Sequence, residues 1–161
     1  MWNLVGFQTR LRIPEQQKVF RAIPGLATAE FLRYGSIHRN AYVNSPAGLG
    51  EALTAKDDDT LFFAGQLTGV EGYTESLGTG LLAGINLARR LQGLPARVPR
   101  PTTMLGGLYR YLREADPKHF QPMNANFGLL DPLPGKVRKD AKKAALVARA
   151  VTEFSAWMST L

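Results

Sequence analysis

The stretch 61–92 constrains the fold most, because it predicts a strand, a glycine-bearing loop and a long helix in direct succession. The apolar run 61–65 is typical of a strand buried on both faces. Gly65, Gly69 and Gly72 allow the backbone of the loop to approach a ligand closely. In doubly wound sheets, ligands lie beyond the carboxyl ends of the strands, where the next helix offers unpaired N–H groups. The sequence therefore predicts an α/β unit with a candidate ligand site at the helix start; a βα pair without a ligand is the alternative.

The helix after this loop is predicted to start with a Thr74 or Ser76 cap and to end near Gln92. Residues 78–83 match the dinucleotide pattern G-x-G-x-x-A, but they lie inside the helix and not at a tight turn after a strand. We therefore reject them as a phosphate loop. Small residues spaced by four predict a smooth helix face for close packing: Gly80, Gly84 and Ala88.

The remaining elements follow from hydrophobic periodicity and from Pro and Gly positions. We expect strands within 3–12 and 31–43, and helices over 15–22, 103–114 and 137–160. Thr102 or Thr103 is the expected cap of the second of these helices. Prolines mark 97–103 as an extended linker, and 120–135 is expected to be an irregular crossing.

Composition excludes several classes of site and protein. The chain has 161 residues, which is enough for one domain or parts of two, and 45% of them are hydrophobic. It contains no cysteine, which excludes disulfides, thiolate zinc sites and a cysteine nucleophile on this chain. His38 and His119 lie 81 positions apart (119 − 38 = 81) without partners at ligand spacing, so we predict no metal site. With no signal-peptide pattern and no apolar run long enough to span a membrane, we expect a soluble, cytoplasmic protein without membrane contact.

Positive charge is concentrated at the two ends of the chain. The whole sequence has 20 Lys and Arg against 13 Asp and Glu, a net charge of +7. One cluster near the start of the last predicted helix consists of Lys136, Arg138, Lys139, Lys142 and Lys143, with Asp140 among them. Cations at a helix N-terminus oppose the macrodipole, so local stability does not favour them. A phosphate-bearing partner such as nucleic acid explains the cluster; a solvated basic face is the alternative.

Several blocks of sequence, spread almost from end to end of the chain, carry a resemblance to a known family: residues 3–9, 15–26, 29–31, 33–35, 38–40, 44–46, 64–76 and 120–129. These blocks resemble the TrmFO family, the bacterial folate- and FAD-dependent tRNA (uracil-5-)-methyltransferases. The related tRNA-modifying flavoproteins of the MnmG/GidA type share the Gly-Gln…Gly-Tyr…Glu core, but residues 38–40 and 120–129 favour TrmFO.

This resemblance implies an incomplete, glutathione-reductase-like FAD-binding domain of Rossmann type, and only its C-terminal part. Residues 1–46 would be the end of an inserted α+β domain, 47–95 the last strand and helix of the FAD-binding domain, and 96–161 a C-terminal helical extension. The implied reaction uses methylenetetrahydrofolate as carbon donor and FAD with NAD(P)H as reductant, and it methylates C5 of a T-loop uridine in tRNA.

The resemblance also assigns residues to the cofactor. Gly65 and Gln66 would lie beside the ribityl chain of FAD, and Gly72, Tyr73 and Thr74 would face the pyrimidine edge of the flavin. The five basic residues of the cluster are the candidate tRNA contacts.

Two features of the family are missing from this sequence: the first strand with its dinucleotide fingerprint, and the catalytic cysteines. We therefore assign no catalytic residue and expect a fragment that needs the missing N-terminal half of the enzyme and is inactive alone. One alternative is a stand-alone basic RNA-binding or interaction module without flavin chemistry. The other is a part of an MnmG-like enzyme that modifies the wobble uridine of tRNA.

Overall fold

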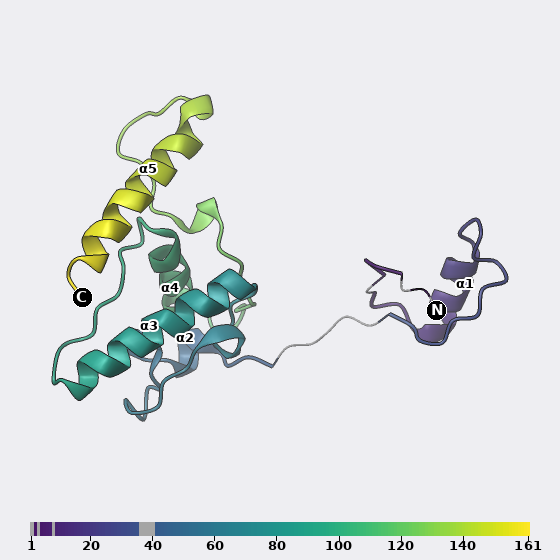
Figure 1. Cartoon of the computed structure of the whole chain (residues 1–161), viewed down its shortest axis with the longest axis horizontal. Helices are drawn as coiled ribbons and strands as arrows, with labels where there is room; N and C mark the ends of the chain where they lie inside the picture. Colours follow the sequence, from purple (N-terminus) through teal and green to yellow (C-terminus); the bar gives the residue numbers. More distant parts are fainter. Residues whose placement is uncertain (1, 3, 8, 36–40) are drawn as a thin grey trace. The chain divides into compact units, whose positions relative to one another are not determined.

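The structure is a computed structural model that describes residues 2, 4–7, 9–35 and 41–161. The chain divides into two compact units, Met1–Arg39 and Asn40–Leu161 (Figure 1). Residues 47–95 and 96–161, which we expect to come from different parts of a larger enzyme, both lie in the second unit. The three-part division at 46 and 95 stays a prediction.

Unit 1 is organised around the short helix α1 (Ile13–Arg21). Pro14 occupies its first turn, where the missing N–H has no intrahelical acceptor to lose. The buried ring of Phe20 packs edge-on against Phe7, with centroids 5.2 Å apart, and lies 5.8 Å from Phe31. The helix predicted over 15–22 is thereby confirmed, with its start two residues earlier.

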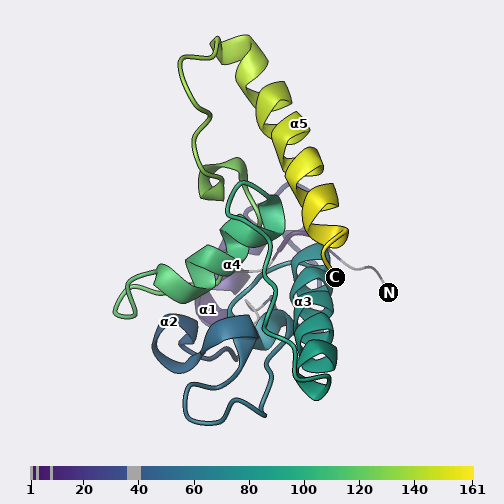
Figure 2. The ribbon, with the colours of Figure 1, turned by 90° about the vertical axis from the view of Figure 1, so that its left-hand side faces the viewer.

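Unit 2 is largely helical (Figure 2). Its helices are α2 (Ser45–Gly48), α3 (Tyr73–Leu91), α4 (Met104–Glu114) and α5 (Lys139–Met158), and its 3-10 turns are η1 (Glu51–Leu53), η2 (Gly65–Thr68) and η3 (Phe127–Leu129). The buried core draws on η1, α3, α4 and α5 and on the loops between the elements: Leu49, Leu53, Val70, Leu82, Leu108, Leu112, Phe120 and Trp157. No helix of the described residues is long and apolar enough to cross a membrane.

The predicted strands do not form in the described parts of the chain. Residues 61–65 make one antiparallel bridge, Thr54↔Phe62, in place of a strand. The amide of Ala55 donates to the Leu61 carbonyl at 2.8 Å, and the Phe63 amide donates to the Leu53 carbonyl at 2.8 Å. A strand needs a ladder of such pairs, and this segment has only one short partner. The described residues of 3–12 and 31–43 form no strand either.

The helix predictions are more accurate. α4 begins where predicted, and the Thr103 side chain caps it by accepting a hydrogen bond from the Gly106 amide at 3.0 Å. α5 matches the expected 137–160 to within two residues at each end. The cap predicted for α3 is wrong: Thr74 and Ser76 lie inside its first turn, and Gly72 is the N-cap.

The irregular crossing between α4 and α5 is fixed by two arginines. The Arg110 guanidinium forms a salt bridge with Asp131 and donates to the Leu129 carbonyl at 2.8 Å. From α5, Arg149 donates to the Pro132 carbonyl at 2.8 Å. The segment 129–132 is therefore held between both helices although it has little regular structure of its own.

Candidate functional site

The N-terminus of α3 is an open helix end. Its N-cap, Gly72, has φ +107° and no side-chain capping bond, and the Ser76 amide closes the first turn on the Gly72 carbonyl at 3.0 Å. Among the described residues, no acceptor binds the amides of Tyr73, Thr74 or Glu75. These donors, with the positive end of the helix dipole, can stabilise negative charge on a bound group.

Gly65 lies beside this helix end although it precedes it by seven residues. Its amide donates to the Thr79 hydroxyl at 2.9 Å, and Thr79 in turn donates to the Glu75 carbonyl at 3.0 Å. A Cβ on Gly65 would come within 3.7 Å of the Ser76 side chain. The buried Thr79 hydroxyl thus ties the start of η2 to the first turns of α3.

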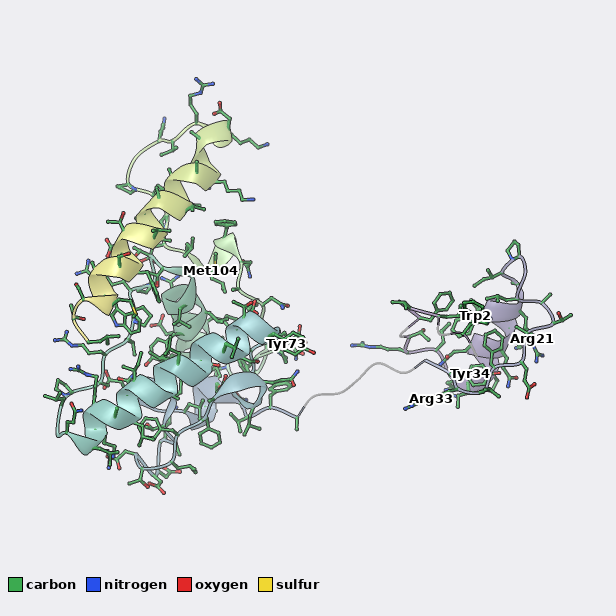
Figure 3. All side chains as sticks on the ribbon, viewed as in Figure 1. Trp2, Arg21, Arg33, Tyr34, Tyr73 and Met104 are labelled. Carbon is green, nitrogen blue, oxygen red and sulfur yellow. The ribbon has the colours of Figure 1, made fainter. Side chains whose placement is uncertain are left out.

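The structure therefore brings the five predicted cofactor residues to one end of α3. Gln66 follows Gly65 in η2 and is exposed. Tyr73 extends from the helix end into solvent, as Figure 3 shows. Thr74 is exposed in the first turn. Their assignment to a cofactor stays a prediction.

A second segment braces the loop in front of α3. The Glu71 amide donates to the Met123 carbonyl at 3.0 Å, and the Asn124 side chain donates to the Glu71 carbonyl at 2.8 Å. The Glu75 carboxylate accepts the Ala125 amide at 2.9 Å. Glu75 is the acidic residue in the first turn of α3, where the helix dipole favours an acid. No local pattern indicates a partner fifty residues away.

This bracing leaves no room for a side chain at position 72. A Cβ on Gly72 would overlap the Glu75 carboxylate and lie 3.4 Å from Asn124 Nδ2. Because the carboxylate is itself held by Ala125, it cannot move aside without losing a hydrogen bond. Both the backbone angle and the surroundings therefore require glycine at this position.

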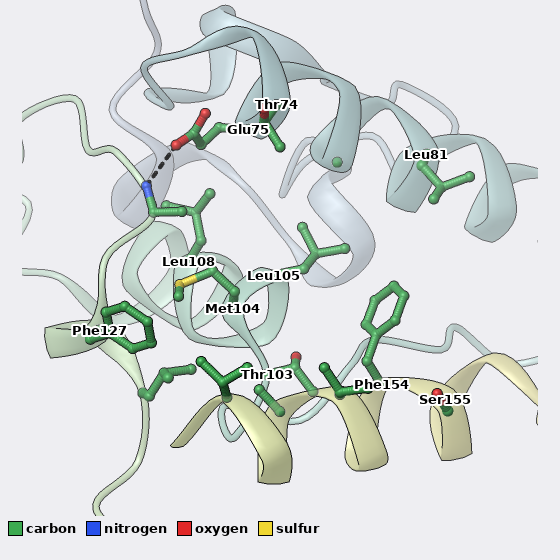
Figure 4. A pocket seen from close by; sticks show the side chains of 16 residues that line it. Thr74, Glu75, Leu81, Thr103, Met104, Leu105, Leu108, Phe127, Phe154 and Ser155 are labelled. Carbon is green, nitrogen blue, oxygen red and sulfur yellow. Dashed lines mark hydrogen bonds between the residues drawn. The ribbon is translucent and has the colours of Figure 1, made fainter. Parts of the chain in front are cut away.

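Thr74 and Glu75 also border an apolar cleft of about 480 Å³ between α3, α4 and α5 (Figure 4). Met104, Leu105 and Phe127 are among its walls, and Phe154 closes the side formed by α5. Only a few polar side chains reach it. The cleft therefore offers an apolar wall directly beside the open helix end, where electrostatic interactions are stronger than in water.

The predicted nucleic-acid residues form an exposed basic patch at the start of α5. The patch consists of Lys136, Arg138, Lys139, Lys142 and Lys143. Asp140 is the acid among them, which leaves five minus one, or four, positive charges. It pairs with Arg138 at 2.9 Å, and the Lys143 ammonium lies 5.4 Å from the centroid of the Phe127 ring. Among the described residues, no carboxylate forms a salt bridge with Lys139, Lys142 or Lys143.

His119 forms a local surface pair. Its Nδ1 lies 2.7 Å from the Asp116 carboxylate, and both side chains are exposed. The hydrogen bond from the Lys118 amide and, to a smaller extent, the one with the His119 side chain hold the pKa of the Asp116 carboxyl below its ordinary value. Within the described residues, no group of three or more His, Asp or Glu is arranged to hold a metal ion. His38 lies outside the described residues.

The fold is that of GidA. A solved structure of Aquifex aeolicus GidA superposes with a TM-score of 0.50 at 23% sequence identity, covering 93% of this chain and 24% of that protein. At this identity the likeness establishes the fold alone.

The sequence model of the GIDA family, glucose inhibited division protein A, matches residues 1–95. The chain belongs to this family. Two similar proteins are named methylenetetrahydrofolate–tRNA-(uracil-5-)-methyltransferase TrmFO: one from Geobacter sulfurreducens is 52% identical and one from Thermus thermophilus 53% identical, each over all 161 residues. The chain spans only 37% and 36% of their lengths. The resemblance to a C-terminal portion of TrmFO, related to GidA, is confirmed.

Proposed function

We propose that this chain forms part of an FAD- and methylenetetrahydrofolate-dependent tRNA (uracil-5-)-methyltransferase. The proposal is supported by relatives of that name that are more than 50% identical over the whole chain. Because the chain spans about a third of their length, the remaining portion must supply the dinucleotide-binding motif and the nucleophile. In the complete enzyme NAD(P)H would deliver the electrons, and a T-loop uridine of tRNA would accept the methyl group.

The observation that carries the proposal is the uncapped start of α3 on Gly72, with Gly65 held beside it. The residues fit a flavin: two glycines with positive φ let the group approach the backbone, and three amides are free of protein acceptors in the described structure. FAD, when bound, supplies the electrons that reduce the transferred carbon. Gly65 and Gln66 would line its ribityl chain, and the amides of residues 73 and 74 would stabilise negative charge at its pyrimidine edge.

The α/β architecture belongs to the same proposal. Residues 61–65 use one side of the backbone for the bridge to Thr54. We infer that the other side pairs with a strand from the missing portion, which would complete a parallel sheet of the glutathione-reductase type. Residues 1–46 would then end the inserted domain, 47–95 close the FAD-binding domain, and 96–161 form the helical extension.

The tRNA would contact the basic patch on α5. Four excess positive charges on one exposed helix start release counterions when they meet phosphates. The position supports this assignment, because the cations oppose the helix dipole and only one acid neutralises them.

Reconstitution tests the proposal. The chain is joined to the portion of the Geobacter sulfurreducens relative that it does not match, and the product is incubated with FAD, NADPH, methylenetetrahydrofolate and unmodified tRNA. Visible flavin absorbance and methyl incorporation at uridine C5 are the expected results. Stoichiometric flavin with modification of a wobble uridine would favour the MnmG-like alternative.

The exposed basic patch favours a second candidate, a stand-alone RNA-binding module. The isolated chain distinguishes the two when it is titrated separately with FAD and tRNA. The module would be supported, and the flavoenzyme contradicted, by two results together. The isolated chain would bind tRNA, and the joined protein would show no bound-flavin absorbance after incubation with FAD.

A further inference from the structure

Three buried hydroxyl side chains converge on the four-residue turn η2. Ser45, Thr68 and Thr79 are 0%, 0% and 1% exposed. Ser45 Oγ donates to the Thr68 carbonyl at 2.6 Å, and Thr68 Oγ1 donates to the Gly65 carbonyl at 2.8 Å. The Gly65 amide donates to Thr79 Oγ1 at 2.9 Å. Both backbone polar groups of Gly65 are therefore engaged by threonine hydroxyls, and the turn is held from both sides.

Thr79 differs from the other two because it belongs to α3. Its hydroxyl donates to the Glu75 carbonyl at 3.0 Å and lies 3.1 Å from the Ser76 carbonyl. Gly65 and Thr79 are fourteen positions apart in the sequence. One oxygen atom therefore joins the start of η2 to the first turn of α3.

The Thr79 hydroxyl contributes direction to this packing and not volume. A valine at the same position would fill the same space, but it could not accept the Gly65 amide, which would lose its partner. A hydrogen bond weakens steeply when its distance or angle leaves a narrow range. The bond to Thr79 therefore fixes where the Gly65 backbone lies relative to the helix, which apolar contact alone does not do.

We propose that Thr79 is a positioning residue of the flavin site. The inference rests on the proposed function, in which Gly65 and Gln66 line the ribityl chain. In the same proposal the amides of residues 73 and 74 face the pyrimidine edge of the ring system. One flavin would contact both parts together, so its affinity depends on the separation between them. The Thr79 hydroxyl sets this separation before the ligand arrives, and a site ordered in advance loses less conformational entropy on binding.

Flavin binding by the joined protein tests the proposal with two ligands. FAD carries the ribityl chain, whereas lumiflavin is the isoalloxazine ring system without it. Thr79→Val removes the hydroxyl and keeps the shape of the side chain. It should weaken FAD binding at least about tenfold and lumiflavin binding less than about twofold, because only FAD spans both parts. Thr79→Ser retains the hydroxyl and should bind FAD as the unchanged protein does. Quenching of flavin fluorescence measures both affinities.

Thr103→Val is the matched control. Thr103 is also 1% exposed, and its hydroxyl accepts the Gly106 amide at 3.0 Å and donates to the Arg100 carbonyl at 2.8 Å. Its loss should lower stability by a comparable amount and leave FAD affinity unchanged. Equal losses of FAD affinity in Thr79→Val and Thr103→Val would overturn the proposal, since any missing buried hydroxyl would then have the same effect. Equal weakening of FAD and lumiflavin by Thr79→Val would also overturn it, because the hydroxyl would then support the helix start alone.

Hydrogen exchange separates this inference from the proposed function. In the joined protein without flavin, Thr79→Val should speed exchange of the Gly65 amide at least about tenfold, and Thr79→Ser should not. A joined protein that shows this faster exchange but binds no FAD would contradict the proposed function, although the Thr79 hydroxyl holds the turn. A joined protein that binds FAD as tightly with Thr79→Val as without it would support the flavoenzyme and contradict the positioning role.

Discussion

The two longest helices begin in opposite ways. α3 starts on a glycine whose surroundings are fixed by two hydrogen bonds, one that the Glu75 carboxylate accepts from the Ala125 amide and one that Asn124 donates to the Glu71 carbonyl. Among the described residues, its first amides have no acceptor. α5 starts among five exposed cations, with no side-chain cap and with one acid that is paired to Arg138. The start of α3 leaves three amides without a protein acceptor among the described residues, whereas the start of α5 presents four excess positive charges.

The start of α4 differs from both, because a side-chain cap stabilises it locally. Thr103 is buried and its hydroxyl both accepts the Gly106 amide and donates to the Arg100 carbonyl at 2.8 Å. Neither α3 nor α5 has such a cap. Relative to a capping side chain, Arg138 at the N-cap of α5 loses about 1 kcal/mol, whereas Gly72 at the N-cap of α3 loses only about a few tenths of a kcal/mol. The comparison therefore shows that α4 is the long helix of unit 2 whose start is stabilised by its own side-chain cap, and that the starts of α3 and α5 are not.

The largest effect is expected at the basic patch. Lys139→Glu, Lys142→Glu and Lys143→Glu together should weaken tRNA binding on the order of a hundredfold at low salt, because three attractive contacts become repulsive. The slope of log affinity against log salt should fall by about 2 to 3. Filter binding over a salt series measures both. The control replaces the exposed Lys18, Arg97 and Lys118 by Glu, which gives the same net charge. An equal loss of tRNA affinity in this control would show that net charge, and not the patch, determines binding.

A slightly smaller effect is expected at the start of α3. Gly72→Val in the joined protein should lower flavin affinity at least about tenfold, because valine is strained at φ +107° by roughly 1–3 kcal/mol and overlaps Glu75. Flavin absorbance after gel filtration measures the retained cofactor. Gly93→Val is the matched control: Gly93 lies just beyond the other end of α3 with φ +70° and open space around it. Normal occupancy in Gly72→Val would show that the flavin lies elsewhere.

The brace of the α3 start should be visible in stability. Glu75→Ala removes the acceptor of the Ala125 amide and should lower the free energy of unfolding by about 1–2 kcal/mol. Glu75→Gln retains an acceptor and should have the smaller effect. Urea denaturation followed by circular dichroism measures both. Asp140→Ala at the exposed start of α5 is the comparison and should change stability by less than about 0.5 kcal/mol. A reversed order would mean that α5, and not α3, has the braced start.

Much of this contrast could be predicted from the sequence, because it depends on local chemistry. The periodicity of α4 and α5, the Thr103 cap and the exposed lysines follow from spacing and charge. The brace could not be predicted, since the Glu75 carboxylate accepts the amide of Ala125, a residue fifty positions away, next to a parallel bridge between Val70 and Met123. The strand expected at 61–65 failed for a related reason. Its apolar pattern specifies burial, but a strand also needs neighbours, and these are not in the described chain.

The smallest effect is also the sharpest test of the comparison. Lys139 is the first residue of α5, so its charge opposes the partial positive charge of the helix end. Lys139→Glu should therefore raise the free energy of unfolding by about 0.3–1 kcal/mol at low ionic strength, and added salt should erase the gain. The same change should weaken tRNA binding. Urea denaturation and filter binding on one preparation measure the pair of effects.

Lys139→Gln should show about half of each, because it removes the positive charge without adding a negative one. If Lys139→Glu stabilises the protein and leaves tRNA binding unchanged, the patch is a solvated surface. If Lys139→Glu weakens tRNA binding without stabilising the protein, the helix dipole does not contribute to the free energy of unfolding at this position. Only a gain in stability together with a loss of tRNA affinity establishes that lysine at position 139 serves the binding of a polyanion and not the stability of the helix.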